Sequence, residues 1–353
     1  MSQPELISDP DQITSDWLTE VLNANNIEGS VNSFTAESIG TGQVDENVRF
    51  TLKGTGDLPA TVVGKFPSPD PVSRATGVSL QNYEKEVYFY KHYQQRVNIQ
   101  TPKVLFTDID EQTHEFIILM EDLAPGVQGD QLAGCDAAAG ELAMVQLAHL
   151  HGPLWGDDSI IDGHIIKETS DEPDVTGDLY NSLMPGFLER YQGRLNDQEI
   201  EMVKLVGECM SGYRNNFDGA RTMIHIDYRL DNMMFGGPYP LAVVDWQSYT
   251  YGCGLNDASY FMGTSMRPDE RAAQDESLLH KYYETLQTYD VNLSWEDCWY
   301  YYRFFAPAGL IMAVIASMIV GETERGNDMF MVMAKGSARM SRELDAIGAI
   351  RGS

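Results

Sequence analysis

Short runs of alternating apolar and polar residues, separated by turn residues, fill the first part of the chain. Alternation with a period of two is typical of β-strands that bury one face, and Gly, Pro and Asp mark the turns between them. A capped helix at 16–22 is expected before the strands, and another with Tyr83, Val87 and Tyr90 on its apolar side after the third strand. Five strands are predicted, at 31–39, 48–52, 60–66, 103–107 and 116–120.

Helical patterns replace this alternation further along the chain. The segment 137–151 is rich in Ala and Leu, and Gly152 and Pro153 end it. Similar patterns continue to the C-terminal end. The sequence therefore predicts an α+β fold with a smaller sheet-bearing lobe at 1–120, a connection at 121–126 and a larger helical lobe at 127–353.

One apolar run, from Phe304 to Val320, has to be weighed as a membrane span. It contains Pro307, is short for a span, and is followed by Glu322 and Glu324 instead of a basic cluster. A buried core helix is therefore expected. The first residues are polar and acidic, which predicts that the chain carries no signal peptide.

The charge and the cysteines narrow the class of protein. The 353 residues carry a formal net charge of −29, which disfavours binding to nucleic acid or to anionic membranes. A cationic substrate would be attracted, although a halophilic or highly soluble surface explains the same charge. The four cysteines are far apart and lack the spacing of a zinc site or a disulfide framework, so a cytoplasmic location is expected.

The candidate chemistry lies at 224–246, where Asp227, Asn232 and Asp245 follow one another around two short apolar runs. Two aspartates and an asparagine are the oxygen groups that phosphoryl transfer from a Mg-nucleotide requires. Asp227 is expected to accept the proton of the acceptor hydroxyl, while Asn232 and Asp245 hold Mg²⁺. Taken singly, each residue is more typical of an ordinary turn between strands than of a metal or catalytic site. The complete pattern favours a nucleotide site.

These residues carry a resemblance. His225-x-Asp227-x-x-x-x-Asn232 and Val243-Val244-Asp245-Trp246 resemble the catalytic and metal motifs of the aminoglycoside phosphotransferase and choline kinase-like superfamily. The resemblance is closest to its ecdysteroid-kinase-like and acyl-CoA-dehydrogenase-associated branches, and it spans roughly residues 30 to 320. It implies a protein-kinase-like fold of two lobes, with a five-stranded antiparallel sheet and a helix in the N-terminal lobe.

Two residues of the catalytic block are interpreted through this resemblance. The family has His-Gly-Asp where this chain has Ile226 in the middle position, which ligates nothing. Arg229 stands where protein kinases often carry a lysine, so the resemblance implies that it neutralises charge on the transferring phosphate.

The nucleotide is expected to bind the first lobe. Glu86 lies on or beside the apolar face of its helix and needs a partner, for which Lys65 at the end of the third strand is the natural choice. The pair is similar to the lysine and glutamate that set the α- and β-phosphates in kinase-like folds. Gly40 and Gly42 form a hairpin turn whose amides could lie over phosphates.

The resemblance also implies supporting roles. The backbones of Glu121 and Leu123 are assigned to the adenine edge of the nucleotide, although an ordinary linker has the same features. Asp257 is assigned to bracing the catalytic loop, with a helix N-cap as its local reason. The aromatic residues clustered at 295–305 are expected to be mainly core, with one or two facing the acceptor.

The leading hypothesis is an ATP- or GTP-dependent O-phosphotransferase that uses Mg²⁺ and acts, as monomer or homodimer, on a small hydroxylated molecule. Aminoglycosides, amino alcohols and steroid-like alcohols all fit. A nucleotide-binding pseudokinase with a sensing or scaffolding role is the alternative, but no expected catalytic residue is missing. A protein kinase is disfavoured because no Phe-Gly pair follows Asp245 and no Ala-Pro-Glu segment follows later.

Overall fold

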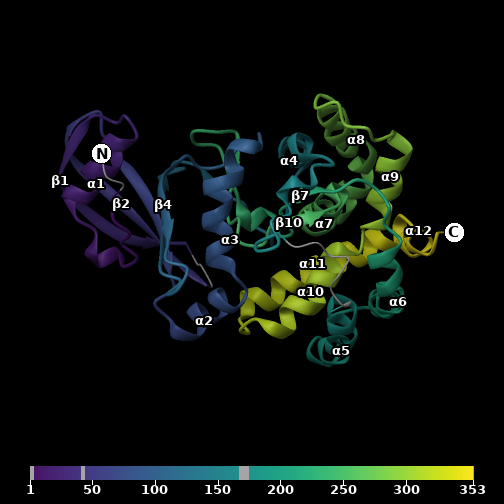
Figure 1. The fold of residues 1–353 in the computed structure, drawn as a ribbon. Coiled ribbons are helices and arrows are strands. Elements are labelled where there is room, and N and C mark those ends of the chain that lie inside the picture. The colour runs from purple at the N-terminus through teal and green to yellow at the C-terminus, as the bar shows by residue number, and fades with distance from the viewer. Residues whose placement is uncertain (1–3, 41–43, 167–174, 353) are drawn as a thin grey trace. The chain divides into compact units, whose positions relative to one another are not determined.

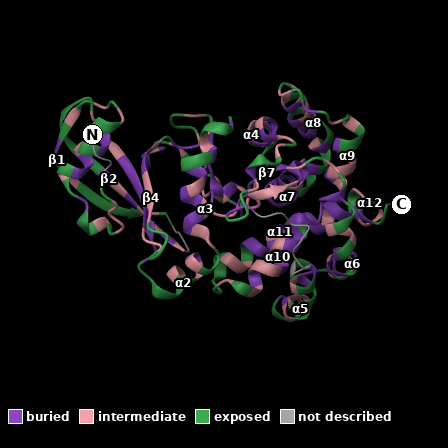
Figure 2. Cartoon of the chain, viewed as in Figure 1, coloured by how far each residue is buried: buried purple, intermediate pink, exposed green. Residues whose placement is uncertain are grey.

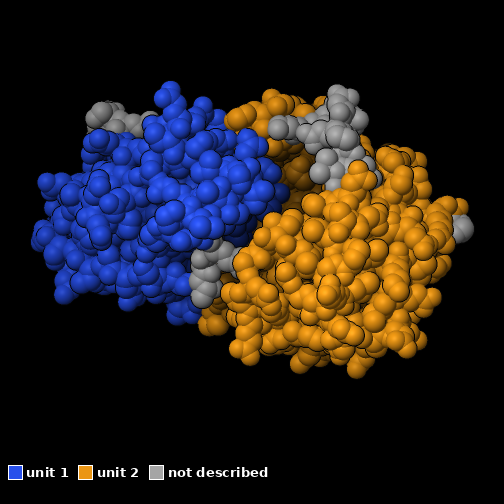
Figure 3. Space-filling model, turned by 90° about the horizontal axis from the view of Figure 1, so that it is seen from below, with its two compact units in different colours: residues 1–96, 100–126, 236–248 blue, residues 97–99, 127–235, 249–353 orange. Residues whose placement is uncertain are grey.

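A computed structural model describes residues 4–40, 44–166 and 175–352. The chain forms two compact units, drawn in different colours in Figure 3. Unit 1 consists of Met1–Arg96, Gln100–Gly126 and Gly236–Ser248. Unit 2 consists of Val97–Ile99, Val127–Phe235 and Tyr249–Ser353. The segment that carries Asp245 thus belongs to unit 1, whereas Asp227 and Asn232 belong to unit 2.

Unit 1 is built on a five-stranded sheet in the order β1-β2-β3-β5-β4, in which neighbouring strands are antiparallel. This confirms the sheet predicted from the alternating pattern, and Ile39 pairs with Asn47 at the end of the hairpin next to the connecting turn. The strands are β1 (Gly29–Ile39), β2 (Asp45–Gly56), β3 (Thr61–Pro67), β4 (Val104–Ile109) and β5 (Phe116–Glu121).

Helix α1 (Ser15–Ala24) packs on this sheet because one of its sides is apolar. Thr14 caps it, since its hydroxyl accepts a hydrogen bond of 3.1 Å from the N–H of Trp17. The Trp17 ring meets Phe106 edge to face at 5.5 Å inside a core shared with Phe50 and Leu119. The expected capped helix is confirmed.

Two helices follow β3. Helix α2 (Pro71–Ser79) begins at a proline and is capped by Asp70, and no helix was predicted there. Helix α3 (Asn82–Tyr88) corresponds to the predicted helix and continues as a π-helical turn over Phe89–Tyr93. Figure 1 shows α3 beside β4. Its buried side carries Glu86 towards the sheet.

Unit 2 is mainly helical (Figure 1). Short strands accompany the helices, with β6 pairing to β8 and β7 to β10. The helices are α4 (Ala137–His151), α5 (Val175–Arg190), α6 (Asp197–Asn215), α7 (Gly254–Ser265), α8 (Pro268–Gln287), α9 (Trp295–Phe304), α10 (Ala308–Ile319), α11 (Glu324–Glu343) and α12 (Ala346–Arg351). The short strands are β6 (Val127–Gln128), β7 (Thr222–Ile224), β8 (Met233–Phe235) and β10 (Thr250–Gly252), while β9 (Leu241–Val243) lies in unit 1.

The apolar run forms α10, which packs against α5, α7 and α11. Leu310, Ala313 and Val314 are fully buried. The stretch Trp295–Ile319 is long and apolar enough to cross a membrane, yet 67% of its most apolar window is buried inside the protein. The expected core helix is confirmed, and Figure 2 shows the buried face of its neighbour α11 in purple.

Candidate active site

The loop after β7 is held by a carboxylate from α7. Asp257 is fully buried and accepts hydrogen bonds from the backbone N–H groups of His225, at 2.5 Å, and Ile226, at 3.0 Å. The expected bracing role of Asp257 agrees with these contacts. Its expected local reason was wrong, because Cys253 occupies the N-cap position and Asp257 lies within the first turn of the helix. Its side chain therefore reaches another segment instead of capping its own helix.

Ile226 occupies the left-handed region of backbone conformation, with φ of +72°. A β-branched residue rarely adopts this conformation, whereas glycine does so readily. The glycine of the family that the sequence resembles would adopt this backbone conformation without strain. The cost of the isoleucine is on the order of 1–2 kcal/mol.

Three side chains hold the carboxylate of Asp227, which is 24% exposed. Arg229 Nε donates to Oδ1 at 2.8 Å and to Oδ2 at 3.0 Å. The Tyr260 hydroxyl donates to Oδ1 at 2.8 Å, and Asn232 Nδ2 donates to Oδ2 at 2.9 Å. Burial raises the pKa of Asp227, but the Arg229 charge and the Tyr260 hydrogen bond outweigh burial and hold the pKa below its usual value. The group is therefore ionised at neutral pH and fixed in direction.

The Asn232 side chain is oriented by the same loop. Its Nδ2 donates to the backbone oxygen of Asp227 at 2.8 Å as well as to the carboxylate. Because the amide nitrogen is used in this way, the amide presents its oxygen as the ligand atom. A neutral oxygen is a ligand that Mg²⁺ accepts, so the residue fits the role expected for it.

Arg229 is engaged on both sides. Besides Asp227 it contacts Asp231, with Nη1 at 2.8 Å from Oδ2, and these carboxylates raise its pKa against the effect of burial. Arg325 from the first turn of α11 donates two further bonds of 3.0 Å to Asp231. These contacts make Arg229 a brace of the loop. Its contact with a transferring phosphate stays a prediction.

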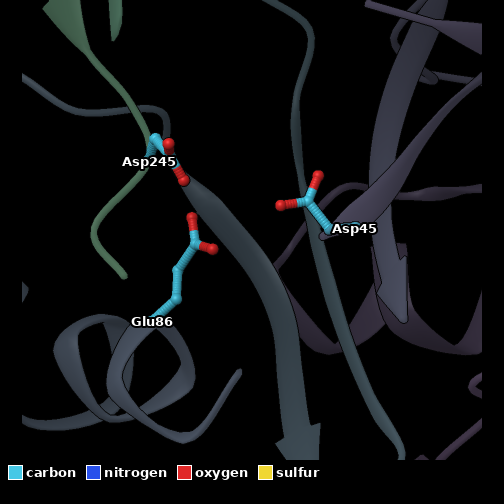
Figure 4. A group of neighbouring side chains, drawn as sticks. All are labelled: Asp45, Glu86 and Asp245. Atoms are coloured by element: carbon cyan, nitrogen blue, oxygen red, sulfur yellow. The ribbon is translucent and has the colours of Figure 1, made fainter. Parts of the chain in front are cut away.

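Unit 1 assembles the second set of residues around Lys65. Its ammonium lies 2.5 Å from Glu86, 3.1 Å from Asp245 and 3.1 Å from Asp45. The contact with Glu86 is the expected ion pair. Figure 4 shows the three carboxylates turned toward one another, and one oxygen of each lies within 4.8 Å of the others.

Burial and charge act against each other in this set. Burial alone would lower the pKa of Lys65, but the three carboxylates raise it well above its usual value. Burial is the main cause that raises the pKa of Glu86 to about 7. The negative charges of Asp245 and Asp45 raise this pKa further, and the Lys65 charge lowers it only in part. Lys65 is therefore firmly charged, and the carboxylates compete for it.

Asp245 leaves β9 in a left-handed conformation, with φ of +69°, which Asp tolerates better than most residues. The next residue, Trp246, is buried and stacks on Phe89 of the α3 extension at 3.8 Å between ring centroids. This stacking fixes the segment on the helix that carries Glu86. Asp245 and Glu86 thus reach Lys65 from two elements that pack on each other.

The remaining predicted residues lie at the ends of strands. Gly40 has φ of +75°, as a turn glycine does, while Gly42 lies outside the described residues. The N–H of Glu121 donates to Lys103, and the carbonyl of Leu123 accepts from Gly126, at 2.9 and 2.8 Å. A contact of these two backbones with adenine stays a prediction.

Tyr260, Asp231, Arg325 and Asp45 were not predicted as site residues. Tyr260 lies one helical turn after Asp257, so a helix bracing the loop could have pointed to it. No local sequence pattern pointed to Arg325 or Asp45 as site residues, because their partners are far away in the sequence.

Comparisons with known proteins give a family match for one segment and a likeness of fold. A model of the ecdysteroid kinase-like family matches residues 165–294. No curated protein matches the sequence. The family match confirms the resemblance that the sequence motifs predicted.

Solved structures extend the likeness to nearly the whole chain. A choline/ethanolamine kinase family protein from Mesorhizobium loti has a TM-score of 0.51 and 13% identity, covering 90% of this chain and 93% of its own. The choline kinase LicA from Streptococcus pneumoniae has a TM-score of 0.50 and 14% identity, covering 92% of this chain and 98% of its own. A mutant aminoglycoside 2'-phosphotransferase-IIIa in complex with GDP has a TM-score of 0.52 and 12% identity, covering 92% of this chain and 98% of its own. The chain therefore has the kinase-like fold of these phosphotransferases.

Proposed function

We propose that the protein is a small-molecule kinase that moves the γ-phosphoryl group of ATP or GTP to a hydroxyl group. The observation that carries this proposal is the pair of assembled residue sets, one around Lys65 in unit 1 and one around Asp227 in unit 2. Each set holds its charged atoms in fixed positions, as phosphoryl transfer requires.

Unit 1 would bind the nucleotide. Lys65 is charged and buried, so its ammonium is suited to the α- and β-phosphates, with Glu86 fixing its position. The edge of adenine or guanine would meet the backbones of Glu121 and Leu123. That one similar protein was solved as a GDP complex supports keeping GTP beside ATP as the donor.

The donor atoms present suit Mg²⁺, which prefers carboxylate and amide oxygens. The bonds of Asn232 Nδ2 to Asp227 leave the amide oxygen as the atom that could bind a metal, and Asp245 offers a carboxylate. Asn232 and Asp245 would therefore hold the metal. When bound, Mg²⁺ neutralises phosphate charge.

Asp227 would act on the acceptor. The acceptor oxygen forms the new bond to the γ-phosphorus as the bond to the β-phosphate oxygen breaks, and a nucleoside diphosphate leaves. The hydroxyl proton passes to the Asp227 carboxylate. Because its low pKa makes this carboxylate a weak base, its main contribution is to orient the hydroxyl until the transition state is reached.

The acceptor class follows from weaker arguments. A net charge of −29 attracts cationic molecules, and the names of the similar structures include choline and aminoglycoside kinases. The family model names ecdysteroids, which are steroids with several hydroxyl groups. Aminoglycosides, amino alcohols and steroid-like alcohols are therefore the three classes to test.

The experiment incubates the protein with Mg-ATP or Mg-GTP and pooled members of these classes, and detects phosphorylated products by mass spectrometry. Asp227→Asn is the inactive variant, and Asp269→Asn is its matched control, because the Asp269 side chain is 92% exposed. A product that forms with the native protein and the control but not with Asp227→Asn supports the proposal. Absence of nucleotide binding overturns it.

A further inference from the structure

Asp45 is a third carboxylate on the lysine that the proposed function assigns to the nucleotide. It is the first residue of β2 and is only 8% exposed. Its Oδ2 lies 3.1 Å from Lys65 Nζ, and its Oδ1 accepts a hydrogen bond of 3.1 Å from Asn47 Nδ2. The Asn47 contact fixes the carboxylate in the direction of the lysine.

The ammonium of Lys65 has no donor to spare in this arrangement. A lysine has three N–H groups, and three carboxylates lie at 2.5, 3.1 and 3.1 Å. When all three carboxylates are ionised, they and Lys65 together carry a formal charge of −2. A polyphosphate that approaches this lysine meets a full set of acceptors and a net negative charge, and both oppose its binding.

One acceptor must leave before a phosphate oxygen can bind Lys65. Glu86 makes the shortest contact and belongs to a helix, and Asp245 is the carboxylate suited to Mg²⁺. Asp45 is not expected to position Lys65 from a helix or to bind Mg²⁺, and it makes one of the two longer contacts with the ammonium. It is therefore the group whose place a phosphate oxygen can take.

We propose that Asp45 occupies the phosphate position on Lys65 and thereby sets the affinity for nucleoside di- and triphosphates, an inference that rests on the proposed function. When nucleotide binds, one N–H of Lys65 passes from Asp45 to a phosphate oxygen. When the nucleoside diphosphate leaves, Asp45 takes the N–H back, so the same exchange favours product release. The exchange breaks and forms hydrogen bonds only.

The test is the affinity of the full chain for Mg-ATP, Mg-GTP and Mg-ADP, measured by calorimetry for the native protein and Asp45→Asn. Removing a charged competitor from a hydrogen bond is worth roughly a tenfold change in dissociation constant. Asp45→Asn should therefore bind each nucleotide roughly tenfold more tightly. Adenosine, which has no phosphate, should bind both proteins equally.

A matched control separates this exchange from the general effect of charge. Glu46 is the next residue, lies half-buried on the other side of β2, and accepts a hydrogen bond from Ser38. Glu46→Gln removes the same charge without touching Lys65, so its nucleotide affinity should stay within about twofold of the native protein. Should Asp45→Asn be unfolded by circular dichroism, the smaller neutral variant Asp45→Ser decides.

The outcomes distinguish the two proposals. If the native protein binds nucleotide and the Asp45 variants bind no more tightly, or Glu46→Gln gains as much, Asp45 does not compete at Lys65 and this inference fails alone. If neither the native protein nor the variants bind any nucleotide, the proposed function fails and this inference fails with it.

Discussion

The hydroxyl of Tyr260 donates a hydrogen bond of 2.8 Å to Oδ1 of Asp227. Tyr260 is almost fully buried on α7, one turn after Asp257, which holds the backbone of the same loop. One helix therefore fixes both the position of the loop and the direction of its carboxylate. Such fixing is what the proposed reaction needs from Asp227.

Tyr260→Phe should lower kcat roughly tenfold and leave KM for nucleotide unchanged. The substitution keeps the ring in its core and removes only the bond to Asp227, so nucleotide binding in unit 1 is untouched. The measurement is steady-state kinetics on the acceptor that the product screen identifies. Tyr301→Phe is the matched control, because its hydroxyl bonds Asp218 at the surface. Equal kcat values for the two variants would show that Tyr260 does not position Asp227.

Asp257→Asn should lower the free energy of unfolding by about 2–3 kcal/mol. The buried carboxylate accepts two backbone N–H bonds, and an amide can accept only with its oxygen, so its NH₂ group faces a donor. Urea unfolding of Asp257→Asn beside the exposed Asp269→Asn measures the difference, and Asp269→Asn should stay within about 0.5 kcal/mol of the native protein. Similar values for the two variants would contradict the bracing role.

Local pattern predicted most of the elements, since alternation and helical spacing are properties of short segments. The pairing of Lys65 with Glu86 also followed from local reasoning, because a carboxylate on an apolar helix face needs a partner. Helix α2 was not predicted from the sequence. Pro71 at its first position, after Asp70 as cap, was the usable signal.

The site was predicted less completely than the fold. The strand β2 was expected from residue 48 and begins at Asp45, so this carboxylate fell outside the expected strand. The contacts of Tyr260 and Arg325 with the loop join residues 33 and 94 positions apart, and no local pattern encodes such pairs. The N-cap expected for Asp257 failed because helix ends are uncertain by a few residues.

Asp122 predicts how stability depends on pH. It follows β5 and forms an ion pair of 2.6 Å with Arg49. Burial raises the pKa of Asp122, but the hydrogen bonds from Arg49 and from the Ala124 backbone outweigh burial and hold the pKa below its ordinary 3.8.

A lowered pKa in the folded state means that the unfolded chain binds the proton more readily. The stabilisation by the Asp122 carboxylate is therefore complete above pH 3.8 and is lost as pH falls through the lower pKa of the folded protein. Urea unfolding of the native protein and Asp122→Asn should show a stability gap at about pH 6 that narrows towards about pH 3. A gap of constant size would contradict the lowered pKa.

Ile226 predicts an inverted order of two small substitutions. At an ordinary position Ala is more stable than Gly by about 0.5–1 kcal/mol, because glycine loses more entropy on folding. At φ of +72° the Cβ of alanine is strained, whereas glycine has no Cβ. The free energy of unfolding of Ile226→Gly should therefore exceed that of Ile226→Ala by about 1 kcal/mol. Both variants lose the isoleucine side chain, so their difference isolates the backbone.

Thermal and urea unfolding of the Ile226 pair would be compared with Ala273→Gly, at an exposed position in the interior of α8. That control should show the ordinary order, with glycine destabilising by about 1 kcal/mol. If the alanine variant at 226 is the more stable of its pair, the loop does not hold a left-handed residue there. The backbone explanation of the family's glycine would then be wrong, and the isoleucine would have to be explained by its half-buried side chain instead.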